Sequence, residues 1–212
     1  MPIAMSTVAK RASFAALTVV GLVLLVVGAW FTIHLGSSGS ATFRTTPAAG
    51  SVVVLEPTVL NRVNRPVTVT ATAKQGAPVF LGVATPSDAK ALLGGADRTM
   101  VQAAHVRDWS LTSARAGAGV APALAEADVW RQVRDGKGTV RITLTQQNAP
   151  ESLVIATGNG RPADLQSLTL TIERRTWFFQ ALLATLVGLL ATAAGAAGLW
   201  HERPRTTEEP AA

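Results

Sequence analysis

Two long apolar runs frame a middle part of the chain in which apolar and polar residues alternate. The first run covers residues 13–35 and has no charged side chain between Ser13 and Ile33. The second covers residues 177–200, with Gln180 as its only strongly polar side chain. A helix needs about 20 predominantly apolar residues to cross a bilayer, so both runs predict transmembrane helices.

Basic residues beside the first run predict the orientation of the chain. Lys10 and Arg11 precede the run, and no lysine or arginine follows it before Arg44. Positive charge collects on the cytoplasmic side of membrane helices, which predicts a cytoplasmic N-terminal tail over residues 1–12. A second crossing returns the C-terminal tail, residues 201–212, to the cytoplasm. The sequence therefore predicts a two-pass protein of the plasma membrane with its middle part outside.

A cleaved signal peptide is the alternative for the first run, because Gly39-Ser40-Ala41 resembles a small-residue cleavage site. Secretory hydrophobic regions have only about 7–15 residues, and this run is longer, so we favour a retained anchor. The serine- and glycine-rich stretch that follows predicts a flexible linker over residues 36–49.

Residues 50–175 are expected to form an all-β, extracytoplasmic domain. Six segments alternate between apolar and polar residues or are continuously apolar, as strands are: residues 51–55, 67–74, 79–83, 141–145, 153–156 and 168–172. Roughly seven strands with regular turn signals indicate an antiparallel sandwich or a small barrel. One short helix is expected over Pro86–Leu93, with Asp88 as its cap and Gly94-Gly95 as its end.

Turn and loop signals separate these segments. Asp135 is expected in a turn, and Asn159-Gly160 is a favoured tight-turn pair. Residues 114–127 are rich in alanine and glycine and predict a long mobile loop. The C-terminal residues 203–212 have the composition of a disordered tail.

Small residues spaced four apart predict a packing face on the second apolar run, because they let helix backbones approach closely. The pairs are Ala184/Gly188, Ala191/Gly195 and Ala194/Gly198. Gly21 and Gly28 lie seven apart in the first run. These faces predict a helix contact, either within the chain or to a membrane-protein partner or a second copy.

The composition removes several kinds of chemistry. The chain has no cysteine, which excludes disulfides, zinc–thiolate sites, iron–sulfur clusters and cysteine nucleophiles. Its three histidines, His34, His105 and His201, are too dispersed to predict a metal cluster. The net charge is +6, but the arginines are scattered rather than gathered on one periodic face. Nucleic acid is therefore not an expected partner, whereas the lipid bilayer is.

No group of residues in the sequence predicts catalysis. His105 lies near Asp108 and Ser110, but triads are recognised by spatial geometry, and the chain has no G-x-S-x-G elbow. Gly117-Ala118-Gly119 lacks the third glycine of a dinucleotide-binding loop. Trp109 and Trp130 could line a ligand pocket, although a structural role is the more common one. The sequence thus assigns no catalytic, cofactor-binding or metal-binding residue.

Several short motifs resemble a family of uncharacterised actinobacterial membrane proteins. Residues 79–84, Pro86, Asp88 and residues 92–95 resemble its FVGIAP…DV…YLxGV segment. Val129-Trp130 match an FW pair of the family, and residues 153–160 are similar to its VVVMNADGS segment. The resemblance covers residues 50–200. It implies a two-helix architecture with a β-rich outer domain in an actinobacterial cell envelope, and it transfers no catalytic residue.

These observations predict a non-enzymatic integral membrane protein of the cell envelope. The first expectation is an accessory or partner-binding subunit that presents its β domain outside the cell. The alternative is a sensor of a ligand or an anionic lipid, since residues 37–175 carry 15 basic and 10 acidic side chains. An enzyme whose site is assembled from distant polar residues is the third class.

Overall fold

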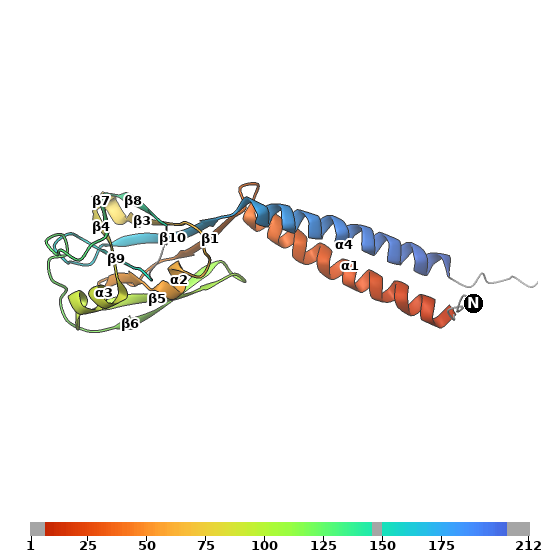
Figure 1. Ribbon diagram of the computed structural model, residues 1–212, viewed down its shortest axis with the longest axis horizontal. Helices are drawn as coiled ribbons and strands as arrows, with labels where there is room; N and C mark the ends of the chain where they lie inside the picture. Colours follow the sequence, from red (N-terminus) through yellow and green to blue (C-terminus); the bar gives the residue numbers. More distant parts are fainter. Residues whose placement is uncertain (1–6, 146–149, 203–212) are drawn as a thin grey trace, which may run out of the picture. The chain divides into compact units, whose positions relative to one another are not determined.

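The fold is known from a computed structural model that describes residues 7–145 and 150–202 of the chain. These residues form two compact units (Figure 1). The helix unit contains the residues up to Gly39 and from Arg174 onward, and the β unit contains Ser40–Glu173. Of the two predicted tails, residues 1–6 and 203–212 lie outside the described residues.

The helix unit consists of α1 (Thr7–Leu35) and α4 (Arg175–His201), which lie side by side (Figure 1). Both are long and apolar enough to cross a membrane, which confirms two long apolar helices at the ends of the chain. They extend a few residues beyond the predicted ranges. Large apolar side chains point away from the pair, and Val19, Ile33 and Leu190 are 61%, 77% and 69% exposed.

Glycines form the contact between α1 and α4. A Cβ atom on Gly21 would lie 2.5 Å from the backbone nitrogen of Thr192, and one on Gly28 would lie 2.6 Å from that of Thr185. On the opposite helix, a Cβ atom on Gly188 would lie 2.8 Å from the carbonyl oxygen of Gly21. Residue numbers rise along one helix as they fall along the other, so the helices are antiparallel. The glycines that predicted a packing face therefore serve a contact within the chain.

The β unit contains ten strands in one sheet among its described residues. The strands are β1 (Ser40–Thr45), β2 (Val52–Leu55), β3 (Val67–Ala73), β4 (Pro78–Ala84), β5 (Arg98–His105), β6 (Ser110–Ala116), β7 (Gln132–Lys137), β8 (Thr139–Leu144), β9 (Ser152–Ala156) and β10 (Leu165–Glu173). Their order across the sheet is β7-β4-β9-β2-β5-β6-β1-β10-β3-β8. The pairings β1–β6 and β2–β5 are parallel, whereas an antiparallel sandwich or small barrel was expected.

The two edges of the sheet come together at one corner. The edge strands β7 and β8 follow each other in the chain and are joined through Gly138, whose φ of +74° suits glycine. The backbone nitrogen of Ala73 donates to the Gly138 carbonyl at 2.8 Å, and Gly138 donates to the carbonyl of Ala77 at 3.0 Å. A connection this short places the end of β7 next to the start of β8, so the two edge strands lie close together at this corner, as their labels do in Figure 1.

Side-chain burial agrees with the sequence pattern in the strands that alternate regularly or are continuously apolar. Along β3, Val67, Val69 and Ala71 are buried while the threonines between them are half-buried, which confirms the alternation. Strands β2 and β9 are buried along their whole length, as their continuously apolar sequences predicted. One face of β2, which carries Val52 and Val54, packs against a short helix.

Within its described residues the unit also contains three short helices, where one was expected. They are α2 (Pro57–Leu60), the 3₁₀ helix η1 (Lys74–Gly76) and α3 (Pro86–Leu93). Helix α3 has the predicted bounds and ends at Gly94, whose φ is +49°. Its cap is Thr85 rather than Asp88: the Thr85 hydroxyl accepts a hydrogen bond from the backbone nitrogen of Asp88 at 3.1 Å. Asp88 instead lies in the first turn, where a negatively charged carboxylate interacts favourably with the helix dipole.

Two segments differ from their predictions because tertiary contacts order them. The predicted linker, residues 36–49, contains β1, which pairs with β10 and buries Ala41 and Phe43. The predicted mobile loop, residues 114–127, begins inside β6 and then carries Leu124, which is fully buried.

A third difference concerns the β7–β8 connection. Asp135 lies within β7 opposite Phe80 of β4, and the turn follows at Gly138.

Candidate functional site

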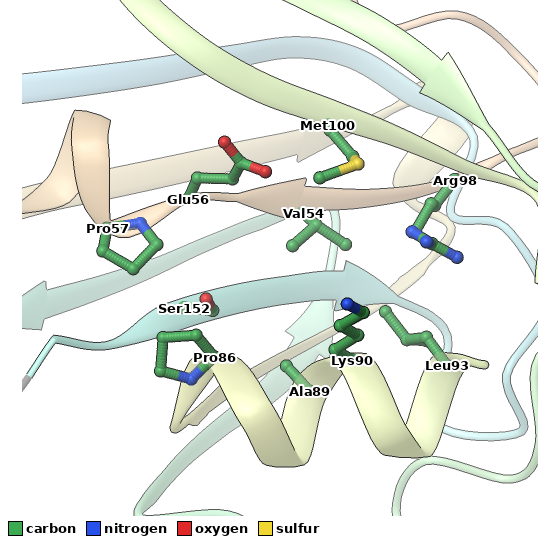
Figure 2. Close-up of a pocket in the computed structure, with 10 residues that line it drawn as sticks. All are labelled: Val54, Glu56, Pro57, Pro86, Ala89, Lys90, Leu93, Arg98, Met100 and Ser152. Atoms are coloured by element: carbon green, nitrogen blue, oxygen red, sulfur yellow. The ribbon is translucent and has the colours of Figure 1, made fainter.

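A pocket of about 410 Å³ lies between helix α3 and the strands β2 and β5 (Figure 2). We call it the α3 pocket. Its apolar wall consists of Val54, Pro57, Pro86, Ala89, Leu93 and Met100. Its polar lining consists of Glu56, Lys90, Arg98 and Ser152. The volume and the mixture of an apolar wall with a few polar groups are typical of a site for a small molecule.

Helix α3 is held over the sheet by its own apolar side. Ala89 and Leu93 are four residues apart and buried against Val54 and Phe80. Pro86 and Lys90 lie on the neighbouring side of the same turns and therefore border the pocket. The threonine cap and the glycine end fix both termini of this eight-residue helix, and they fix the position of Lys90 with it.

The two strands contribute their residues from one face. The parallel register pairs Val52 with Arg98 and Val54 with Met100. Side chains alternate between the faces of a strand, so Val54, Glu56, Arg98 and Met100 share the face that α3 covers. Ser152, the first residue of β9, is 4% exposed and adds a hydroxyl to the same lining.

Three charged side chains surround the apolar wall. Figure 2 shows Glu56 near Pro57 and Lys90 and Arg98 toward Leu93. The Nη1 atom of Arg98 donates to the carbonyl of Gly94 at 2.8 Å and to that of Ala96 at 3.2 Å. Within residues 7–145 and 150–202, the ion pairs of the protein involve none of these three charged groups.

An ion pair next to the pocket anchors the start of β5. Asp97 accepts two hydrogen bonds from the guanidinium of Arg115 on the paired strand β6, with the Nε donor at 2.8 Å. This hydrogen bonding, with a smaller coulombic contribution, holds the pKa of the Asp97 carboxyl below its usual value. The same partner raises the pKa of Arg115. The pair fixes the chain next to Arg98 without entering the pocket.

The structure does not assemble a triad at His105. His105 ends β5 and Ser110 begins β6, so the two residues face each other across a hairpin. The Ser110 hydroxyl donates to Asp108 at 2.9 Å and not to the histidine. These residues shape the end of the hairpin.

The glycine pair Gly117 and Gly119 also has a local role. Gly119 donates to the carbonyl of Gly95 at 2.8 Å, and its own carbonyl accepts from Asp97 at 2.8 Å. Gly117 has a φ of +78° and lies against the backbone of Ala96, where a side chain would collide. The glycines therefore close the loop after β6 onto the end of α3.

The two tryptophans are half-buried and pack against core side chains, and neither lines the pocket. Trp109 stacks near Phe43 with ring centroids 5.4 Å apart. Trp130 packs edge-on against Phe80 and covers Gly82, and its indole nitrogen donates to the Leu124 carbonyl at 2.7 Å. Both positions favour the structural interpretation over a ligand-binding one.

The charged residues of the α3 pocket were not singled out by the sequence. Glu56, Lys90 and Arg98 are far apart in the chain and belong to no motif. A weak signal exists, because Glu56 directly follows the buried strand β2 and Arg98 begins β5. Charged residues at strand ends are common, so only the spatial arrangement distinguishes these.

In the described part of the chain, no three histidine, aspartate or glutamate side chains gather in a group that could hold a metal ion. Neither a protein-family model nor a curated protein or a solved structure matches this chain. The resemblance to the actinobacterial membrane family therefore stays a prediction.

Proposed function

We propose that this chain is a non-enzymatic, two-pass protein of the cytoplasmic membrane whose β unit lies outside the cell and binds a small ligand in the α3 pocket. The pocket itself carries the binding part of the proposal. Its three charged groups border an apolar wall and have no ion-pair partner within residues 7–145 and 150–202. Charged groups in such a position can bind a ligand without first breaking an internal ion pair.

The surface of the helix unit supports the membrane part of the proposal. Side chains such as Val19, Ile33 and Leu190 expose most of their area on a continuous apolar surface. Water disfavours such a surface, whereas a lipid bilayer accommodates it. Glycine-mediated packing between the helices is also typical of membrane helix pairs.

The antiparallel helix pair supports the proposed topology. The backbone nitrogen of Arg174 donates to the Gly39 carbonyl at 3.1 Å, so the two chain segments that lead to the β unit leave the helix unit at one end. Arg11 donates to the Glu202 carbonyl at the other end. If both helices cross the bilayer, the β unit lies on one side and both tails lie on the other. Lys10 and Arg11 favour the cytoplasm for the tails.

Single cysteines test this topology cleanly, because the natural chain has none. We expect a membrane-impermeant maleimide to label Asn61→Cys in intact cells and Thr7→Cys only after the cells are permeabilised. Leu22→Cys, on the exposed surface of α1, should stay unlabelled in both conditions. Labelling of Leu22→Cys in intact membranes would contradict insertion, and reversal of the other two results would contradict the orientation.

A partner-binding or accessory subunit of an envelope complex is the second candidate function. The observation that favours it is a small-residue face on α4 that α1 does not cover, since Ala193 and Ala197 are exposed and four residues apart. The test is mass spectrometry of tagged full-length protein purified from its own membranes in nanodiscs. A stoichiometric partner that is lost in Ala193→Leu supports this role, and an unchanged set of co-purifying proteins contradicts it.

A further inference from the structure

The α3 pocket has charges of opposite sign at its two ends. The parallel register places Arg98 beside Val52, and Glu56 lies four residues after Val52, directly beyond the end of β2. At about 3.3 Å per residue, the backbones of Arg98 and Glu56 are about 13 Å apart along the strands. Val54 and Met100 form an apolar floor between them. A ligand that satisfies both ends therefore needs a negative group, a short apolar body and a positive group, in that order.

The positive end is suited to a carboxylate. Hydrogen bonds to Gly94 and Ala96 hold the guanidinium of Arg98 in place before any ligand binds. A side chain that is already ordered loses less conformational entropy on binding. Lys90, one turn before the end of α3, adds a second cation to the lining and lies between Ala89 and Leu93 in Figure 2. Guanidinium groups bind carboxylates through short, charge-assisted hydrogen bonds.

The negative end is suited to an ammonium group. Glu56 is half-buried between the end of β2 and the start of α2, beside Pro57. A ligand with only an anionic group and an alkyl chain would place that chain against the Glu56 carboxylate. Covering a carboxylate with apolar atoms removes its hydration without providing a partner, which is costly. A fatty acid is therefore a poor match for the whole pocket.

We propose that the α3 pocket binds a short apolar peptide with two free termini. In this arrangement the peptide carboxylate lies at Arg98 and Lys90, its ammonium group lies at Glu56, and its small side chains contact Val54 and Met100. An extended peptide covers at most about 3.3–3.6 Å per residue, so two or three residues cover the distance once the charged side chains reach in from both ends. This inference rests on the proposed ligand-binding function and specifies its ligand class.

The test is a calorimetric titration of the full chain in nanodiscs with four probes. Trialanine should bind saturably. N-acetyl-trialanine and trialanine amide, each lacking one terminal charge, should bind at least about tenfold more weakly, since a hydrogen bond to a charged group is lost. Octanoate, which carries a carboxylate and an alkyl chain, serves as the lipid-like probe.

Variants assign the binding to the pocket. Glu56→Gln and Lys90→Gln should each weaken trialanine binding about tenfold or more, and Glu56→Gln should also abolish the difference between trialanine and its N-acetyl form. Lys137→Gln, on the exposed strand β7, is the matched control and should bind like the natural chain. Thermal unfolding of each variant shows whether it remains folded.

The outcomes separate the ligand class from the pocket's function. Equal binding of trialanine and its blocked forms overturns the zwitterion proposal. If octanoate binds, trialanine does not, and Lys90→Gln abolishes octanoate binding, the zwitterion proposal is also overturned. The proposed ligand-binding function of the pocket is then still supported. A third outcome has two parts: none of the four probes binds, and the natural protein co-purifies with no small molecule that is missing from the Lys90→Gln variant. In that case both the inference and the proposed ligand-binding function are wrong.

Discussion

Replacing Leu124 with alanine tests whether the alanine- and glycine-rich segment after β6 belongs to the core. Leu124 is fully buried beside Val154 and Ala156 of β9, although it lies in no helix or strand. The substitution removes three carbon atoms and leaves the backbone carbonyl that accepts the Trp130 hydrogen bond. The perturbation is therefore mainly a cavity.

The size of the effect follows from this burial. Leu→Ala substitutions at fully buried positions cost about 2–5 kcal/mol, and sites that can partly collapse lie at the lower end. Leu124 is in an irregular segment that can adjust, so we expect a loss of about 2–3 kcal/mol. For a unit of this size, about 1 kcal/mol corresponds to roughly 4 °C in Tm. The β unit should therefore unfold roughly 8–12 °C earlier.

Thermal unfolding of the full chain in detergent, combined with amide hydrogen exchange, measures this loss. Exchange should accelerate in residues 117–131, which the cavity loosens. Val120→Ala is the matched control, because Val120 lies in the same segment and is 92% exposed. It should change stability by no more than about 0.5 kcal/mol. Equal unfolding temperatures for the two variants would refute the assignment of this segment to the core.

Three further predictions concern other parts of the molecule. Gly188→Leu should separate α1 from α4 and lower the thermal stability of the helix unit in detergent, whereas Ala193→Leu on the exposed side should not; equal effects would contradict the glycine contact. Asp97 has a lowered pKa when folded, so its pair with Arg115 stabilises the protein above about pH 4 and is lost as the pH falls through the folded pKa. Asp97→Asn should therefore be less stable at pH 7, and its free energy of unfolding should fall less steeply as the pH is lowered. An unchanged pH dependence of the free energy of unfolding would contradict the role of the pair. Thr85→Ala removes the cap of α3 and should cost about 1 kcal/mol in chemical unfolding; no loss would mean that the cap does not stabilise the helix.

Strands with a strong burial pattern could be predicted from the sequence. β3 alternates cleanly because one of its faces is buried, and β2 and β9 are continuously apolar because both faces are. β6 and β7 are mostly exposed, and β6 buries only Leu111. Such strands have no periodic signal, and they form because their backbones pair with a neighbouring strand. β1 was mistaken for part of a linker because a serine- and glycine-rich stretch leads into it.

The candidate site could not be predicted, for a related reason. Glu56 and Arg98 face the same pocket because β2 and β5 pair in parallel, a pairing that connects distant parts of the chain. Neither residue has a distinctive neighbour in the sequence. The cap of α3 was also not predictable from the sequence. Both Thr85 and Asp88 are good capping residues, and the backbone conformation makes Thr85 the cap.

The sequence by itself determined the two long apolar helices, the most strongly buried strands and the close-packing glycines, because hydrophobic burial and backbone approach act on residues at fixed local spacings. Only the tertiary structure decided the parallel pairings, the meeting of the two edge strands at Gly138, the burial of Leu124 and the α3 pocket. These features depend on contacts between residues far apart in the chain. The free energy that stabilises these features comes from the packing of the whole unit, so no local sequence pattern predicts them.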